Sequence, residues 1–181
     1  IYDEALSGRQ TGFLPGGGFL VTWEPNGPAD RFDIMARLFD ATTAAAVNGT
    51  TFTTDDFVVN QRSAFNFSPV LATGAAATIV AWLYRSEDGG SRTNVTSTIL
   101  GPDGAHVSGA ETSLTATDTE VRTPSALALA NGRFVVVWEQ VRAETFSSEI
   151  RAMLLEADGS AVWTPMSSGF GDFPVNAAPS I

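Results

Sequence analysis

The stretch Phe134-Val135-Val136-Val137-Trp138 is an apolar run that ends in tryptophan, and two related runs precede it in the chain. The earlier copies read Phe19-Leu20-Val21-Thr22-Trp23 and Thr78-Ile79-Val80-Ala81-Trp82. The three tryptophans lie about 59 and about 56 residues apart, which indicates a tandem repeat of about 56 residues. We therefore expect one structural unit to occur three times.

A short lead-in segment precedes each run. It contains Ser68-Pro69 in one copy and Pro124-Ser125 in the next, and Pro179-Ser180-Ile181 begins another. Glycine-rich turns, Pro15-Gly16-Gly17-Gly18 and Asn131-Gly132, lie between lead-in and run. Such residues allow two strands to reverse direction, so each lead-in and run is predicted to form a β-hairpin.

A third and a fourth strand are expected after each tryptophan. The third strands end at Asp103-Gly104 and Asp158-Gly159, which are preferred tight-turn pairs, whereas the first copy has Asp40-Ala41-Thr42-Thr43 and should turn more loosely. The fourth strands are expected at Phe57-Val58-Val59-Asn60 and Phe173-Pro174-Val175-Asn176, with a weaker counterpart at Glu111-Thr112-Ser113-Leu114. Each copy thus has four predicted strands.

The second strand is apolar at consecutive positions, so both of its faces should be covered by neighbouring sheets. This pattern predicts an all-β fold of tandem four-stranded antiparallel sheets arranged as β-propeller-like blades, with stacked β-sandwich modules as the alternative. Trp23, Trp82 and Trp138 are predicted core anchors of the repeat, and Gly104 and Gly159 are its turn glycines.

The repeat divides the sequence into five parts. Residues 1–8 are the tail of a preceding repeat, residues 9–67, 68–123 and 124–178 are three repeats, and residues 179–181 begin a further one. This division predicts a segment of a larger repetitive assembly, whose partners are further copies of the repeat or identical subunits.

Composition argues against several kinds of partner. The chain has 20 acidic and 10 basic side chains and a net charge of −10, which opposes binding to phosphate backbones, so no nucleic-acid partner is expected. It has no cysteine, which rules out a disulfide framework and a thiolate zinc site. The most apolar stretch, residues 70–83, is shorter than the roughly 20 residues of a membrane span.

The ordered motifs resemble the tandem β repeats of large secreted bacterial surface proteins that accompany hemolysin-type (RTX) calcium-binding repeats. The matching pieces are residues 17–23, residues 34–41, Phe57-Val58-Val59-Asn60 and Ala157-Asp158-Gly159. The resemblance implies an extracellular or cell-surface structural protein. The calcium-binding nonapeptide of those proteins does not occur in this sequence.

The candidate binding residues lie in the polar segments that follow the repeat tryptophans or outside the repeat pattern. They are Trp163, Asp30, Asp33, Glu87 and Asp88. Trp163 falls outside the tryptophan register and is the aromatic residue expected to face a partner, such as a glycan or a surface. The carboxylates are candidate calcium ligands, although no cofactor is expected to be required.

Catalysis is not expected from the sequence. His106 is the single histidine and no G-x-S-x-G motif is present, so a serine hydrolase triad has no support. The principal hypothesis is a non-catalytic structural or adhesive repeat that acts through assembly and partner contacts. One alternative is a calcium-stabilised adhesin module that binds glycans or a surface, and another is a propeller glycosidase with carboxylates gathered from several blades.

Overall fold

The computed structural model describes the repeat units and leaves out some of the connections between strands. The described residues are 9–14, 17–25, 33–43, 45, 56–86, 92–107, 111–116, 120–141, 147–162 and 171–176. Their twelve strands are β1 (Gln10–Phe13), β2 (Gly18–Trp23), β3 (Met35–Asp40), β4 (Asp56–Val58), β5 (Phe65–Thr73), β6 (Thr78–Arg85), β7 (Asn94–Leu100), β8 (Thr112–Ser113), β9 (Glu120–Ala128), β10 (Phe134–Val141), β11 (Ser148–Leu155) and β12 (Phe173–Pro174). No described helix is long and apolar enough to cross a membrane.

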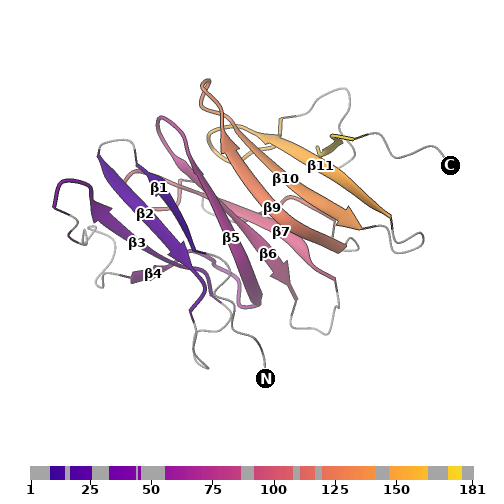
Figure 1. The fold of residues 1–181 in the computed structure, drawn as a ribbon, viewed down its shortest axis with the longest axis horizontal. Helices are drawn as coiled ribbons and strands as arrows, with labels where there is room; N and C mark the ends of the chain where they lie inside the picture. Colours follow the sequence, from indigo (N-terminus) through magenta and orange to yellow (C-terminus); the bar gives the residue numbers. More distant parts are fainter. Residues whose placement is uncertain are drawn as a thin grey trace.

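The described strands form three four-stranded antiparallel sheets, each built from strands that are consecutive in the chain (Figure 1). Their orders are β1-β2-β3-β4, β5-β6-β7-β8 and β9-β10-β11-β12. This confirms the predicted all-β fold of propeller-like blades, and we call the sheets the first, second and third blades. The second and third blades begin at Phe65 and Glu120, a few residues before the repeat boundaries placed at 68 and 124.

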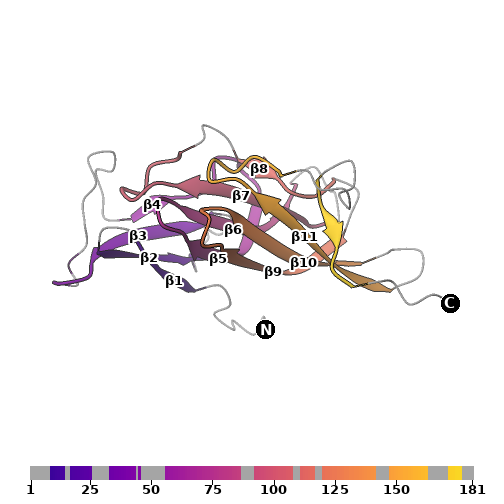
Figure 2. The same cartoon turned by 90° about the horizontal axis from the view of Figure 1, so that it is seen from above.

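The blades stack face to face, and their first strands lie side by side (Figures 1 and 2). Strand β5 contacts both β1 and β9, so these three strands form the inner side of the stack, and β4 and β8 lie along the other side. One apolar cluster fills the space between the first and second blades, and a second cluster fills the space between the second and third. The core is therefore a series of seams between sheets.

Burial of the second strand differs between blades. The first six residues of β6 are all buried, whereas buried and half-exposed residues alternate along β2 and over most of β10. The expectation that both faces of this strand are covered is thus confirmed for the middle blade and wrong for the other two. The reason is geometric, because each outer blade has a neighbour within the chain on one face only.

The turn between the third and fourth strands follows the sequence in each blade. Gly104 and Gly159 have φ of 78° and 86° and donate their N–H groups to the carbonyls of Gly101 and Glu156 at 3.0 Å. The first blade instead uses Asp40, whose Oδ1 accepts N–H groups from Thr42 and Thr43 at 2.9 and 2.8 Å. The looser turn predicted for this copy is confirmed.

A reciprocal pair of hydrogen bonds joins the beginning of the third strand to the end of the fourth in all three blades. Side-chain oxygens of Asn60, Thr115 and Asn176 accept the N–H groups of Ile34, Val95 and Ile150 at 2.6, 3.1 and 2.7 Å. The preceding residues, Val59, Leu114 and Val175, return N–H bonds to the same partners. An asparagine therefore closes the first and third blades, and a threonine closes the second.

Candidate functional site

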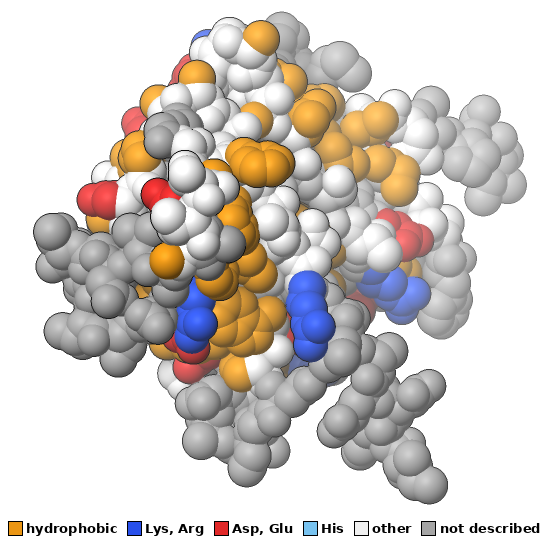
Figure 3. All heavy atoms as spheres, turned by 60° about the vertical axis from the view of Figure 1, so that its left-hand side comes forward, with side chains coloured by type: hydrophobic (Ala, Val, Ile, Leu, Met, Phe, Trp, Pro, Cys, Tyr) orange, Lys and Arg blue, Asp and Glu red, His pale blue; other side chains and the backbone are white. Residues whose placement is uncertain are grey.

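The exposed face of the first blade carries a shallow hollow of about 370 Å³. Its lining residues come from the segment before β1 and from β2, β3 and β4, and they are Arg9, Val21, Trp23, Arg37, Phe39 and Asp56. Hydrophobic side chains gather on this side of the molecule, with basic side chains beside them (Figure 3). Such a mixture of aromatic and charged groups suits either a ligand or another protein surface.

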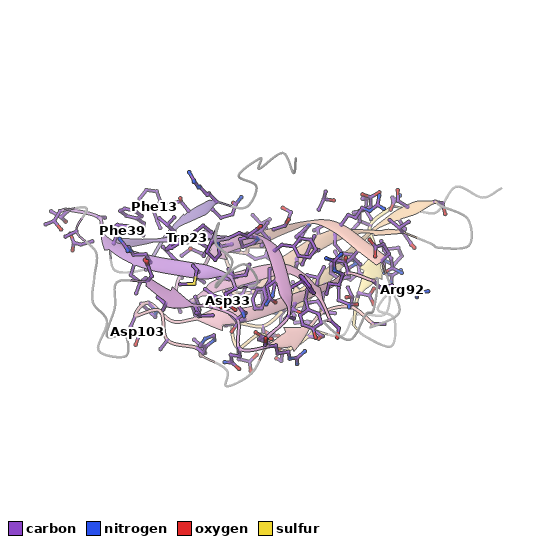
Figure 4. All side chains as sticks on the ribbon, turned by 90° about the horizontal axis from the view of Figure 1, so that it is seen from below. Phe13, Trp23, Asp33, Phe39, Arg92 and Asp103 are labelled. Carbon is purple, nitrogen blue, oxygen red and sulfur yellow. The ribbon has the colours of Figure 1, made fainter. Side chains whose placement is uncertain are left out.

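Cross-strand pairs organise this face. Phe19 is paired with Phe13 on one side and with Phe39 on the other, so three phenylalanines form a row across β1, β2 and β3. The Phe19 and Phe39 rings are stacked with centroids 4.9 Å apart, and Phe13 is 77% exposed. Arg37 forms an ion pair with Asp56 beside the row. Phe13, Trp23 and Phe39 lie near one another in Figure 4.

The three repeat tryptophans have different surroundings. Trp82 and Trp138 are buried within the seams, with 0% and 1% of their surface exposed, as expected for core anchors. Trp23 is only half-buried, so the prediction of a buried anchor is wrong for this residue. Its face lacks a covering sheet within the described chain, whereas the first blade covers Trp82 and the second covers Trp138.

Asp33 is the predicted binding residue that the structure describes. Its Oδ1 accepts a hydrogen bond from Asn60 Nδ2 at 2.8 Å, and the same amide nitrogen donates to the Arg62 carbonyl at 3.0 Å. Asn60 is the buried residue that also closes the first blade. The Asp33 carboxylate is half-buried and is held at the edge of the first blade where β3 begins and the chain passes to the second blade.

Glu111 lies close to the same chain crossing and is almost completely buried. Its Oε1 accepts N–H groups from Gln61 and Arg62, and its Oε2 lies 3.4 Å from Arg62 Nε. Glu111 therefore fixes the connection between two blades.

His106 lies in the outer part of the second blade, where its Nδ1 is 2.8 Å from Thr98 Oγ1. Burial lowers the pKa of His106, and the negative charge of Glu111 partly opposes this shift.

The inner strands β5 and β9 each contain a bulge that sequence reasoning missed. Ser68 and Thr123 have positive φ values of 54° and 47°, and each precedes a proline. The register of each strand with its neighbour shifts at this point. The Ser68 N–H is bound by the carboxylate of Glu24, which follows Trp23 in the preceding blade. The Ser/Thr-Pro pair recurs at both bulges, but a residue before proline normally favours extended backbone and so does not predict them.

The remaining predicted binding residues, Asp30, Glu87, Asp88 and Trp163, lie outside the described residues. Among the residues that are described, no three histidine or acidic side chains come close enough together to hold a metal ion. The predicted calcium ligands are therefore not tested by the described geometry.

No protein-family model matches the sequence, and no curated protein matches it. The fold is similar to that of an endo-arabinase from Bacteroides thetaiotaomicron, with a TM-score of 0.57 and 10% identity over 98% of this chain. The chain spans 66% of the length of that enzyme. An α-L-arabinanase from Cellvibrio cellulosa, solved with arabinohexaose, aligns with a TM-score of 0.48 and 10% identity, over 84% of this chain and 55% of that one.

The likeness to the endo-arabinase corrects the expectation that the chain is not an enzyme. That protein is a β-propeller glycosidase, so an arrangement of blades like this one also occurs in an enzyme. At 10% identity, the likeness establishes the arrangement of the blades.

Proposed function

We propose that this chain is part of a β-propeller glycoside hydrolase that acts on an arabinan-like polysaccharide. The observation that carries the proposal is the alignment of 98% of the chain with the blades of an endo-arabinase. A polysaccharide is too large to reach the cytoplasm intact, so we also infer that the protein works outside the cell.

The substrate would bind at the edge of the stacked blades where β2, β6 and β10 end, which is the lower edge in Figure 1. The connections that follow β2 and β6 contain Asp30, Asp33, Glu87 and Asp88 in the sequence. Glycoside hydrolysis usually requires a pair of carboxyl groups, one acting as acid and the other as base or nucleophile. We expect these connections to bring acidic residues from neighbouring blades together at this edge.

Asp33 is the member of this group whose hydrogen-bond partner the structure describes. Asn60 donates to one carboxylate oxygen and thereby orients the group without neutralising its charge. A carboxylate held in this way keeps a second oxygen available for a substrate hydroxyl or a proton. We assign Asp33 to the substrate-binding edge on this basis.

The test is release of reducing ends from debranched arabinan, with xylan, galactan and a β-glucan as alternative substrates. We expect hydrolysis of arabinan and a fall in kcat of at least about 100-fold in Asp33→Asn, the scale of lost acid–base catalysis. Asparagine can still accept the Asn60 hydrogen bond, so the fold should persist. Asp103→Asn is the matched control, because Asp103 lies in an exposed turn at the opposite end of β7, where its Oδ1 accepts the Ala105 N–H and an asparagine oxygen can do the same.

Two results would contradict the proposal at different levels. Failure of the unaltered protein to cleave any of these polysaccharides would remove the glycosidase function. Full activity in Asp33→Asn and in the corresponding amide variants of Asp30, Glu87 and Asp88 would retain the function but remove this edge as its site.

A further inference from the structure

A buried carboxylate of the second blade holds the backbone next to the Asp33 site. Glu111 directly precedes β8, and only 1% of its side chain is exposed. Its Oε1 accepts the N–H groups of Gln61 and Arg62, which follow Asn60 in the connection from the first blade to the second. This attachment is strong, because hydrogen bonds to an ionised group are about twice as strong as those between neutral groups.

The connection held by Glu111 contains the residue that orients Asp33. Asn60 is 7% exposed, and its Nδ2 donates to Asp33 Oδ1 at 2.8 Å and to the Arg62 carbonyl at 3.0 Å. Its Oδ1 accepts the Ile34 N–H at 2.6 Å. Glu111 is therefore linked to Asp33 through a short stretch of backbone and one buried amide.

A second amide of the second blade holds the same stretch of backbone. Asn66 lies in β5, and its Nδ2 donates to the carbonyls of Arg62 and Ala64 at 3.3 and 3.2 Å. Its Oδ1 accepts the indole N–H of the buried Trp82 at 2.8 Å. The N–H and the carbonyl of Arg62 are thus both bound by side chains of the second blade, while Asp33 belongs to the first.

We propose that Glu111 is a positioning residue for Asp33. It fixes the connection that contains Asn60 and so keeps the Asp33 carboxylate in one orientation at the substrate-binding edge. The inference rests on the function proposed above, in which Asp33 acts at this edge. With 1% of its side chain exposed, Glu111 does not reach a polysaccharide and acts only through Asp33.

Amide hydrogen exchange measured by NMR tests this positioning without requiring activity. The Ile34 N–H is bound by Asn60 Oδ1, and the Ile150 N–H is bound in the same way by Asn176 Oδ1 in the third blade. We expect Glu111→Ala to speed exchange of the Ile34 N–H about tenfold and to leave the Ile150 N–H unchanged. An unchanged Ile34 exchange rate would overturn the proposal.

Two further variants separate the acceptor role of Glu111 from other effects of the substitution. Glu111→Gln keeps an acceptor oxygen, and the 49% exposed Arg62 side chain can turn to water, so Ile34 should exchange as in the unaltered protein. Glu156→Ala is the matched control, because Glu156 also pairs with an arginine, Arg133, but lies in the third blade. If Glu111→Gln exchanged as fast as Glu111→Ala, the acceptor role would be wrong.

A double-mutant cycle on debranched arabinan tests whether Glu111 acts through Asp33. We expect Glu111→Ala to lower kcat about 10- to 100-fold, the scale of a misplaced catalytic group, and Glu111→Gln to retain most of it. In the Asp33→Asn background, Glu111→Ala should cause no further loss. An equal fall in kcat in both backgrounds would show a general structural role and contradict the proposal.

Asn60→Thr tests the same link if Glu111→Ala does not unfold cooperatively in urea. Threonine can close a blade, as Thr115 Oγ1 does by accepting the Val95 N–H, but it has no amide to donate to Asp33. We expect kcat to fall as for Glu111→Ala, with a melting temperature close to that of the unaltered protein. An unchanged kcat in Asn60→Thr would refute the link.

Failure of the proposed function is distinguishable from failure of this inference. If the unaltered protein cleaves none of the polysaccharides, the glycosidase function is wrong. The exchange rate of the Ile34 N–H still decides whether Glu111 holds Asn60 in place.

Discussion

Glu24 connects the first two blades through a single carboxylate. Its side chain is half-buried at the end of β2 and accepts the N–H of Ser68, whose φ is positive at 54°. Burial raises the pKa of Glu24 above its ordinary value of 4.5, and the hydrogen bond from Ser68 opposes this shift only in part. The charged form is therefore less favourable in the folded protein than in the unfolded chain.

This pKa shift predicts how pH acts through Glu24. Between pH 4.5 and the raised pKa, the folded state binds more protons than the unfolded state, so the contribution of Glu24 to stability falls as pH rises. Glu24→Gln keeps an acceptor for Ser68 and removes this dependence. We expect the melting temperature of Glu24→Gln, relative to the unaltered protein, to increase from pH 4 to pH 7.

Glu24→Ala is the contrasting variant for this measurement. It leaves the Ser68 N–H without its acceptor, and we expect its unfolding free energy to lie about 1 kcal/mol below that of Glu24→Gln at both pH values, because neither variant has an ionisable group at this position. If Glu24→Gln and Glu24→Ala destabilise the protein equally at pH 7, the acceptor role assigned to Glu24 is wrong.

Trp82 and Trp138 show how much one residue can differ between repeats. The Trp82 indole N–H donates to Asn66 Oδ1 at 2.8 Å, whereas the Trp138 indole N–H is buried without a partner among the described residues. The strand register places Val121 in the third blade where the second blade has Asn66. The sequence predicted the burial of both tryptophans, but the partner of Trp82 comes from a strand that only folding places beside it.

At the scale of the element, the turns between third and fourth strands show a strong local signal. Asp103-Gly104 and Asp158-Gly159 form turns in which glycine has positive φ. Asp40 replaces this arrangement in the first blade by binding two backbone N–H groups with its side chain. These turns were predictable because their conformation depends on residues that are adjacent in the chain.

The turn conformation leads to a prediction for Gly159. At φ of 86°, alanine in Gly159→Ala would be strained, and we expect a loss of about 1 to 2 kcal/mol in unfolding free energy measured with urea. Gly74→Ala is the matched control, because its new Cβ would lie 3.4 Å from the nearest atoms, at ordinary contact distance, and its φ is not positive. Equal stability of the two variants would show that the backbone of Gly159 is not constrained.

The two bulges were less predictable than the turns. A residue before proline normally favours extended backbone, so Ser68-Pro69 and Thr123-Pro124 gave no local indication of positive φ. The shift becomes understandable only in the sheet, where β5 and β9 each place two residues opposite one residue of β6 or β10 and also pack against the adjacent blades. Non-local packing can hold a strained backbone that local preference would reject.

At the scale of the whole molecule, most described acidic side chains already have partners within the chain. Asp56, Glu111, Glu156 and Asp172 form ion pairs with arginines, and Glu24 binds a backbone N–H. Carboxylates engaged in this way have less to gain from a divalent cation. The described blades are therefore expected to be stable without calcium.

Thermal unfolding with and without calcium tests this expectation. We predict the same melting temperature in EGTA and in millimolar calcium, with magnesium as the control for general ionic effects. A calcium-specific increase would contradict the prediction and direct attention to Asp30, Glu87 and Asp88 in the connections between strands.

The sequence by itself determined the repeat, the four strands of each blade, their tight turns and the burial of Trp82 and Trp138. These features follow from local turn chemistry and from the apolar pattern along single strands. The tertiary structure decided that Trp23 stays half-exposed, that Glu24 binds the next blade, and that buried and half-exposed residues alternate along β2 and over most of β10. Whether a face is covered depends on which sheets are stacked against it, and the pattern of a single strand contains no information about its neighbour's position.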